Sequence, residues 1–256
     1  MEKEHSHSKL NMKISAVIIA KNEEKMIAEA IDSVAFCDEV IVIDNSSNDK
    51  TSEIALEKNA KVTKIESNNF SEIRNLGKDL AKAEWIFYID ADERVTTELR
   101  KSIQENIEKK EYSAFKVLRQ NFYMNRKWPN IEEMERLFRK EALKRWTGKL
   151  HETPDYEGKI GILDGYLLHY THRDLSQMLD KTIEWSDAEA LERFSSNHPK
   201  MSWWRFLRVM LTSFIKSYFI ERGFRAGTVG IIESLYQSYS SFITYAKLWE
   251  MQEKKK

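Results

Sequence analysis

The stretch 85–93, WIFYIDADE, decides the fold of this chain. Its first five residues form an almost continuous apolar run, which is typical of a strand buried on both faces of a parallel sheet. The run passes directly into three acidic residues, two of which are separated by a single alanine. Because ligands of open α/β sheets bind beyond the carboxyl ends of the strands, this junction predicts a binding site.

The residues before this stretch alternate between two periodicities. Apolar runs at 14–19 and 40–43 are predicted strands, and a weaker predicted strand lies at 61–65. Between the strands, apolar residues recur at helical spacing within 27–34 and 73–80. This alternation predicts an α/β fold, with a mostly parallel sheet and helices on both of its faces.

Polar side chains follow three of the predicted strands. Asn22, Asp44 and Asp90 each stand at or just beyond a strand end, and right-handed crossovers bring such ends to one edge of the sheet. We therefore expect these three residues to converge. Asn22 is also a plausible N-cap for the first helix, with Glu23 in its first turn, and Thr96 is the expected cap of a helix after Val95. Residues 112–170 are expected to be mixed, with short strands and loops.

The pair Asp90 and Asp92 is suited to a hard divalent cation. Carboxylate oxygens bind Mg²⁺ or Mn²⁺, which can bridge the oxygens of a diphosphate and offset the charge of a departing nucleotide. Asp44 could accept the imide N–H of uracil, and Arg74 could contact the base or the phosphates. The alternatives are an ordinary acidic loop tip for the pair and a surface ion pair for Arg74.

Two common nucleotide-binding motifs are absent from the sequence. The chain has no GxGxxG, which disfavours a dinucleotide-binding domain, and no GxxxxGK[ST], which excludes a P-loop. A nucleotide would therefore be bound by the polar residues at the strand ends.

Taken together, these segments resemble family 2 glycosyltransferases of the GT-A fold. The resemblance extends over roughly residues 13–250, and its later part is similar to the bacterial lipopolysaccharide-core glucosyltransferase-like group. The early motifs are AKNEE at 20–24, VIDNSSNDKT at 42–51, RN at 74–75 and IDADE at 89–93. The later motifs are ERLFRK at 135–140, LHE at 150–152, LHY at 168–170 and YAKLWE at 245–250.

The resemblance implies an inverting transferase that moves a hexose, glucose in the first instance, from a UDP-sugar to a lipid-linked saccharide such as lipopolysaccharide core. On the donor side, Asp44 would hold uracil, Arg74 the base or ribose, and Asp90 the ribose or diphosphate. Asn22 and Glu23 would complete the nucleotide-sugar site.

The resemblance also implies a metal ligand and a base. Asp92 would bind Mg²⁺ or Mn²⁺, and His169 would supply a further metal or phosphate contact. Glu152 would deprotonate the acceptor hydroxyl for in-line attack on the anomeric carbon. Two plainer interpretations stay open: Glu152 could form a loop salt bridge, and His169 could be a hydrogen-bonded core histidine in a strand.

Two other functions remain to be weighed. A sugar nucleotidyltransferase shares the fold but normally has a glycine-rich basic loop after the first strand, and residues 20–24 contain no glycine. A non-catalytic protein that binds nucleotide-sugars or a membrane surface through a degenerate site is harder to exclude.

The sequence predicts three regions: a disordered leader at 1–12, a catalytic domain at 13–173 and a helical extension at 174–256. In the extension, Arg205, Arg208, Thr212 and Lys216 fall within an arc of about 80° at about 100° per residue. This basic amphipathic helix either lies on an anionic membrane or caps the catalytic domain with its cations in water.

Several features bear on location and partners. The single cysteine, Cys37, excludes an intrachain disulfide and indicates a reducing compartment. The first 12 residues lack an apolar core of a secretory signal. We therefore expect a cytoplasmic protein, peripheral on the inner face of the cytoplasmic membrane. Basic and acidic residues balance at 41 each, and no nucleic-acid partner is expected.

Overall fold

A computed structural model describes residues 12–148 and 152–254 of the chain. The described residues form two compact units, one within 12–118 and 133–167, and the other within 119–132 and 168–254. This grouping is by compactness, so the expected boundary between a catalytic domain and an extension at 173/174 stays a prediction. The expected leader lies, apart from Met12, outside the described residues.

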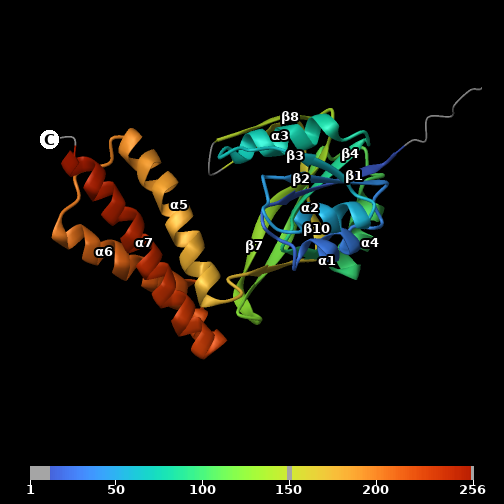
Figure 1. The fold of residues 1–256 in the computed structure, drawn as a ribbon. Helices are drawn as coiled ribbons and strands as arrows, with labels where there is room; N and C mark the ends of the chain where they lie inside the picture. The colour runs from blue at the N-terminus through green and yellow to red at the C-terminus, as the bar shows by residue number, and fades with distance from the viewer. Residues whose placement is uncertain (1–11, 149–151, 255–256) are drawn as a thin grey trace, which may run out of the picture. The chain divides into compact units, whose positions relative to one another are not determined.

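A sheet of eight strands is the framework of the fold (Figure 1). The strand order is β3-β2-β1-β4-β7-β6-β10-β5. The first four strands in this order are parallel to one another, and β7 is antiparallel to β4. The strands are β1 (Ile14–Ala20), β2 (Glu39–Asp44), β3 (Lys61–Lys64), β4 (Trp85–Asp90), β5 (Glu93–Val95), β6 (Ala114–Tyr123), β7 (Arg126–Arg139) and β10 (Ile160–Thr171). A second sheet pairs β8 (Leu143–Thr147) with β9 (Thr153–Tyr156).

Helices cover both faces of the parallel strands, as Figure 1 shows. One face packs against α1 (Ile27–Ser33), α2 (Thr51–Glu57) and α4 (Thr97–Asn106), and the other against α3 (Phe70–Leu80) and β8. Because successive side chains of a strand point to opposite faces, each strand contributes alternate residues to the two cores. The predicted α/β class, with its mostly parallel sheet, is therefore confirmed.

Three local predictions differ in outcome. Thr96 caps α4, since its Oγ1 accepts a hydrogen bond from the Leu99 amide at 3.3 Å. Asn22 does not cap α1: that helix begins at Ile27, and Asn22 has a left-handed φ of 55°. The expected short strands of residues 112–170 are also wrong in length, because β6, β7 and β10 have 10, 14 and 12 residues.

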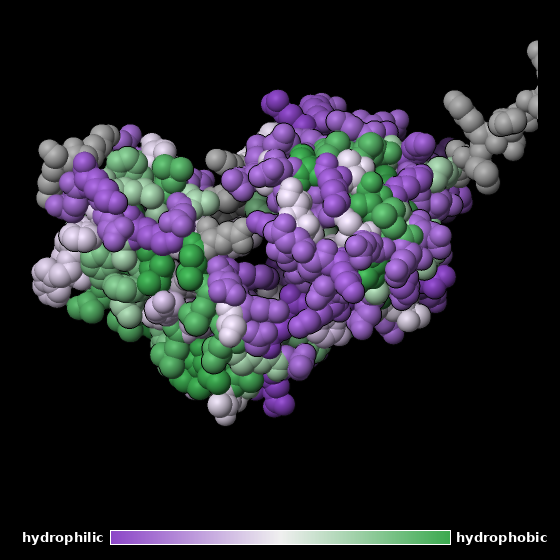
Figure 2. Space-filling model, in the orientation of Figure 1, coloured by the Kyte–Doolittle hydropathy of each residue, from purple (hydrophilic) through white to green (hydrophobic). Residues whose placement is uncertain are grey.

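The second unit is mainly helical, as expected. It contains α5 (Leu175–Ser195), α6 (Trp203–Ile215), the π-helical turn η1 (Lys216–Ile220), the 3-10 turn η2 (Gly223–Ala226) and α7 (Thr228–Lys254). Both α5 and α6 pack against α7. No helix among the described residues has the length and apolar character needed to cross a bilayer. Apolar surface is nevertheless gathered on this unit (Figure 2).

The close packing of α3 on the sheet depends on Gly77. A Cβ at this position would lie far inside van der Waals contact with a methyl group of Val17 on β1. The α-helix that carries Arg74 can therefore approach the sheet only because this residue has no side chain.

We predict that Gly77→Ala destabilises the protein by about 1–2 kcal/mol in urea unfolding. Overpacking costs about 1–3 kcal/mol, and the better helix propensity of alanine offsets part of that cost. The exposed Asp79→Ala on the same helix is the matched control. Adding Val17→Ala should recover part of the loss; if the two changes are simply additive, the contact does not set the helix position.

Candidate active site

Three strand ends meet at one edge of the sheet, as the sequence predicts. Ala20 pairs with Asp44 across β1 and β2, and Ile19 pairs with Asp90 across β1 and β4. The Ala91 amide also donates to the Ile19 carbonyl at 3.1 Å. The loops that follow β1, β2 and β4 therefore leave the sheet side by side.

Asp44 closes the loop that follows β2. Its Oδ1 accepts a hydrogen bond from the Ser47 amide at 2.9 Å, and its Oδ2 accepts from the Ser52 hydroxyl. The side chain is fully buried. A carboxylate can accept about four hydrogen bonds, so these two leave Asp44 able to accept more. The expected contact with uracil stays a prediction.

Asn22 and Glu23 join the loop after β1 to this same loop. The Asn22 amide donates to Ser47 Oγ at 2.9 Å, and its side-chain oxygen accepts from the Asn48 amide at 2.8 Å. The Glu23 amide donates to Thr51 Oγ1 at 2.8 Å. The left-handed backbone of Asn22 thus builds the rim of the site instead of starting a helix, and the nucleotide-sugar contacts expected of Asn22 and Glu23 stay predictions.

Asp90 lies between two arginines. Its Oδ2 is 2.9 Å from Nη2 of Arg136, and its Oδ1 is 3.5 Å from Nη2 of Arg74. Arg136 also reaches Glu93 Oε1 at 3.0 Å, while Glu93 Oε2 accepts from the Asp90 amide at 2.9 Å. The acidic loop is therefore held by side chains from β7 and α3 as well as by its own strand.

Arg136 is a residue of this site that the sequence analysis did not single out. Its side chain is 2% exposed and that of Glu93 is 0% exposed. Burial alone would lower the pKa of Arg136, but the nearby Asp90 and Glu93 carboxylates outweigh burial and raise this pKa. The available signal was an arginine directly before Leu137 and Phe138 in an apolar strand, where a buried cation needs an acidic partner.

A second arginine fixes the backbone of the acidic loop. Arg94 donates through Nη1 to the carbonyls of Ala91 and Glu93 at 3.0 and 2.8 Å, and through Nη2 to the Met26 carbonyl at 2.8 Å. The loop that carries Asp92 is thereby tied to the segment leading into α1. Asp92 itself is largely buried.

Arg74 is placed differently from the sequence interpretation of a surface ion pair. It is buried, its Nε donates to Glu152 Oε1 at 2.7 Å, and its guanidinium lies 5.0 Å from the Trp146 ring centre. Its neighbour Asn75 exchanges two hydrogen bonds with the Trp146 backbone, at 2.8 and 3.0 Å. Asn75 thus pins α3 to β8 while Arg74 points into the site.

His169 lies on β10 in the second unit. Its Nδ1 is 2.8 Å from Oδ1 of Asn121. The predicted contact of His169 with a metal or a phosphate stays a prediction. His151, the neighbour of Glu152 in the expected motif, lies outside the described residues.

The acidic loop offers oxygen donors for a divalent cation. Mg²⁺ is usually bound by one or two carboxylates together with substrate phosphates and water, and Asp90 and Asp92 are donors of that chemistry. Within the described ranges, no group of three or more His, Cys, Asp or Glu side chains is arranged around a common point. The residues thus fit a cation that a diphosphate helps to hold.

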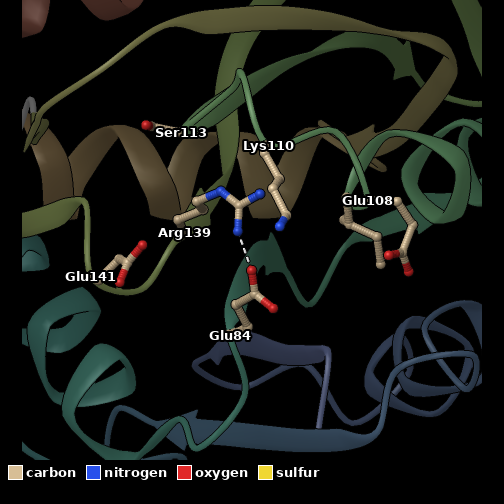
Figure 3. A pocket seen from close by; sticks show the side chains of 7 residues that line it. Glu84, Glu108, Lys110, Ser113, Arg139 and Glu141 are labelled. Atoms are coloured by element: carbon tan, nitrogen blue, oxygen red, sulfur yellow. Dashed lines mark hydrogen bonds and ion pairs between the residues drawn. The ribbon is translucent and has the colours of Figure 1, made fainter. Parts of the chain in front are cut away.

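A separate pocket opens near the other end of β4 (Figure 3). Glu84 and Arg139 are ion-paired there, and Arg139 also donates to the Tyr112 carbonyl at 2.9 Å. The lining combines three carboxylates with two cations and favours no class of ligand; it comprises Glu84, Ile107, Glu108, Lys110, Ser113, Arg139 and Glu141.

The sequence matches known proteins over most of its length. The model of glycosyl transferase family 2 matches residues 15–164. An uncharacterized glycosyltransferase of Rickettsia typhi is 30% identical over 257 residues, covering 93% of this chain and 87% of the relative. The lipopolysaccharide core biosynthesis glycosyltransferase LpsC of Rhizobium meliloti is 25% identical over 255 residues, covering 93% and 92%.

Solved structures are similar to a smaller part of the chain. The glucosyl-3-phosphoglycerate synthase of Mycobacterium tuberculosis, in complex with Mn²⁺ and UDP-glucose, matches 43% of this chain and 44% of its own chain. The identity is 21% and the TM-score 0.38. A likeness of this extent carries no conclusion about the site.

We predict that Arg136→Met lowers the free energy of unfolding by about 3–5 kcal/mol, because it leaves the buried Glu93 without its cation. Urea denaturation followed by circular dichroism measures the loss. The exposed Arg145→Met on β8 is the control and should change stability by about 0.5 kcal/mol at most. Equal stability of the two variants would contradict the role of the buried ion pairs.

Proposed function

The chain belongs to glycosyl transferase family 2, and from that premise we propose that it is an inverting, metal-dependent hexosyltransferase. The proposed donor is a UDP-sugar, UDP-glucose in the first instance. The proposed acceptor is a lipid-linked saccharide of the cell envelope such as lipopolysaccharide core. The similarity to LpsC over nearly the whole chain supports this acceptor class.

One contact carries the proposal. Arg74 joins Glu152, the proposed base, to Asp90 of the acidic loop, at 2.7 Å and 3.5 Å. Glu152 and Asp90 are 62 residues apart in the sequence. In a transferase the base, which acts on the acceptor, must lie close to the donor site. An arginine that contacts both Glu152 and Asp90 supports that arrangement.

The donor would occupy the edge formed by the loops after β1, β2 and β4. We assign Asn22, Glu23 and Asp44 to the nucleotide, and Asp90 to the ribose or diphosphate. A divalent cation held by Asp92, with His169 as a further contact, would offset the charge that gathers on the leaving diphosphate.

Glu152 would act on the acceptor. Its carboxylate takes the proton of the acceptor hydroxyl as that oxygen bonds to the anomeric carbon, and the bond from this carbon to the diphosphate breaks with inversion. Arg74 Nε keeps the carboxylate oriented, since it binds Glu152 Oε1 in a largely enclosed position. The released proton resides on Glu152 until solvent takes it up.

We predict that a UDP-sugar raises the melting temperature by about 5–10 °C at about a hundredfold excess over Kd, and only with Mn²⁺ or Mg²⁺. GDP- and CMP-sugars should have no effect. Asp92→Asn should abolish the metal-dependent shift, whereas the exposed Asp79→Asn should retain it. Flat melting curves for every donor would remove the transferase proposal and favour a degenerate binding protein.

We predict that Glu152→Gln lowers kcat by about 10²–10⁴-fold and leaves the donor-induced thermal shift unchanged. The glutamine oxygen can still accept the hydrogen bond from Arg74 Nε, so the site keeps its shape while it loses the proton acceptor. Steady-state kinetics with a UDP-sugar and NMR of the product linkage are the measurements. Normal turnover in this variant would assign the base to another residue.

A further inference from the structure

The hairpin of α6 and α7 has small polar residues on its inside. Ser217 Oγ lies 3.0 Å from Ser234 Oγ, and Ser213 Oγ lies 2.7 Å from Ser241 Oγ. Ser238 donates to the Met210 carbonyl at 2.9 Å. Hydroxyl contacts therefore join the two helices in the half of the hairpin nearest its turn.

Two glycines let the turn close tightly. A Cβ at Gly230 would collide with the Gly223 carbonyl, and a Cβ at Gly223 would collide with Trp128 and the Ser217 carbonyl. Close backbone approach through glycine and serine is the packing mode of helices whose surroundings are apolar.

The outside of the same hairpin carries large apolar side chains. The outer stripe comprises Trp204, Leu207, Leu211, Ile215, Phe219 and Ile220, with exposed fractions of 45, 59, 59, 39, 57 and 70%. Figure 2 shows apolar surface gathered on the helical unit, toward the end where α6 leads into α7 in Figure 1. In water, exposed apolar side chains gathered in this way are unfavourable.

Cations border this stripe. At about 100° per residue, Arg205, Arg208 and Lys216 lie on one side of the α6 part of the outer stripe, from Trp204 to Ile215. The guanidinium groups of Arg205 and Arg208 lie 4.9 and 5.4 Å from the Trp204 ring centre. Residues 203–220 contain no Asp or Glu.

We propose that the α6–α7 hairpin embeds its outer stripe in one leaflet of an anionic membrane, without crossing it. The apolar side chains would enter the boundary of the acyl chains, with the turn at Phe219 and Ile220 deepest, and the cations would contact lipid phosphates. Trp204, beside two arginines, has the amphipathic character favoured at the membrane–water interface.

The charges beside the outer stripe favour an anionic membrane over a second copy of the chain. A two-fold dimer through the outer stripe would bring the same patch of both copies together. Arg205 and Arg208 would then meet their equivalents with no acidic residue of 203–220 between them, whereas Lys216 has Glu221 as an ion-pair partner at 3.7 Å. An anionic lipid surface supplies the missing negative charge.

The structure changes the earlier picture of this segment. The sequence predicts a basic amphipathic helix that lies on an anionic membrane or caps the catalytic domain, and in the structure the apolar residues of α6 divide into two sets. Val209 is buried against the unit, whereas Leu207 and Leu211 point outward. Insertion of apolar side chains therefore adds to charge attraction, and this surface does not depend on the transferase assignment.

The test is flotation of the full chain with vesicles of phosphatidylcholine, alone or mixed with phosphatidylglycerol. The unaltered protein should float with the mixed vesicles. Phe219→Ser combined with Ile220→Ser should reduce partitioning by at least about tenfold, because each buried apolar side chain contributes more than a tenfold factor. Arg205→Gln with Arg208→Gln should weaken binding to the mixed vesicles by about fivefold per residue.

The matched control is Leu175→Ser combined with Leu191→Ser on α5, whose residues are 54 and 51% exposed. It should float normally. Circular dichroism and the UDP-sugar thermal shift, unchanged in all variants, separate this test from folding and from donor binding. No flotation of the unaltered protein would overturn the proposal, as would a dimer in light scattering that the Phe219→Ser and Ile220→Ser pair disrupts.

Discussion

A buried cation shared by two carboxylates holds the candidate site together. Arg136 on β7 binds Asp90 and Glu93 on either side of the acidic loop, with almost no exposure to water. Buried charges persist only where partners of opposite sign replace the lost hydration, so each member of this group depends on the others. The parallel strands bring Asp90 to the sheet edge, and the antiparallel β7 supplies the charge that keeps it there.

The same electrostatic network reaches Glu152, the proposed base, through Arg74. This arginine contacts both Asp90 and Glu152, so the residues proposed for the donor and for proton transfer belong to one connected set. Its position is set by packing: Gly77 brings α3 close to β1, and Asn75 ties α3 to the Trp146 backbone. A small displacement of α3 would therefore alter the surroundings of Glu152 and of the acidic loop together.

The two units place their apolar side chains differently. The sheet unit buries its apolar residues in two cores on opposite faces of the strands. The hairpin of the helical unit instead places serines such as Ser217 and Ser234 inside and residues such as Leu211 and Ile220 outside. The first arrangement is stable in water, whereas the second favours surroundings that are themselves apolar.

Periodicity and strand-end position are local properties, so the sequence alone predicts the parallel strands, the helices between them, the Thr96 cap and the convergence of the strand ends. The acidic loop was found for the same reason. The sequence does not predict the lengths of β6, β7 and β10. Only the tertiary structure decided the partners of Arg136 and Arg74, the true role of Asn22 in the rim, and which apolar residues of α6 face outward. These depend on pairs such as Arg136 with Asp90 and Arg74 with Glu152, which are 46 and 78 residues apart. A charged residue in an apolar strand, or a helix with apolar residues on two sides, indicates that a partner is needed. Only the folded chain shows which residue or surface that partner is.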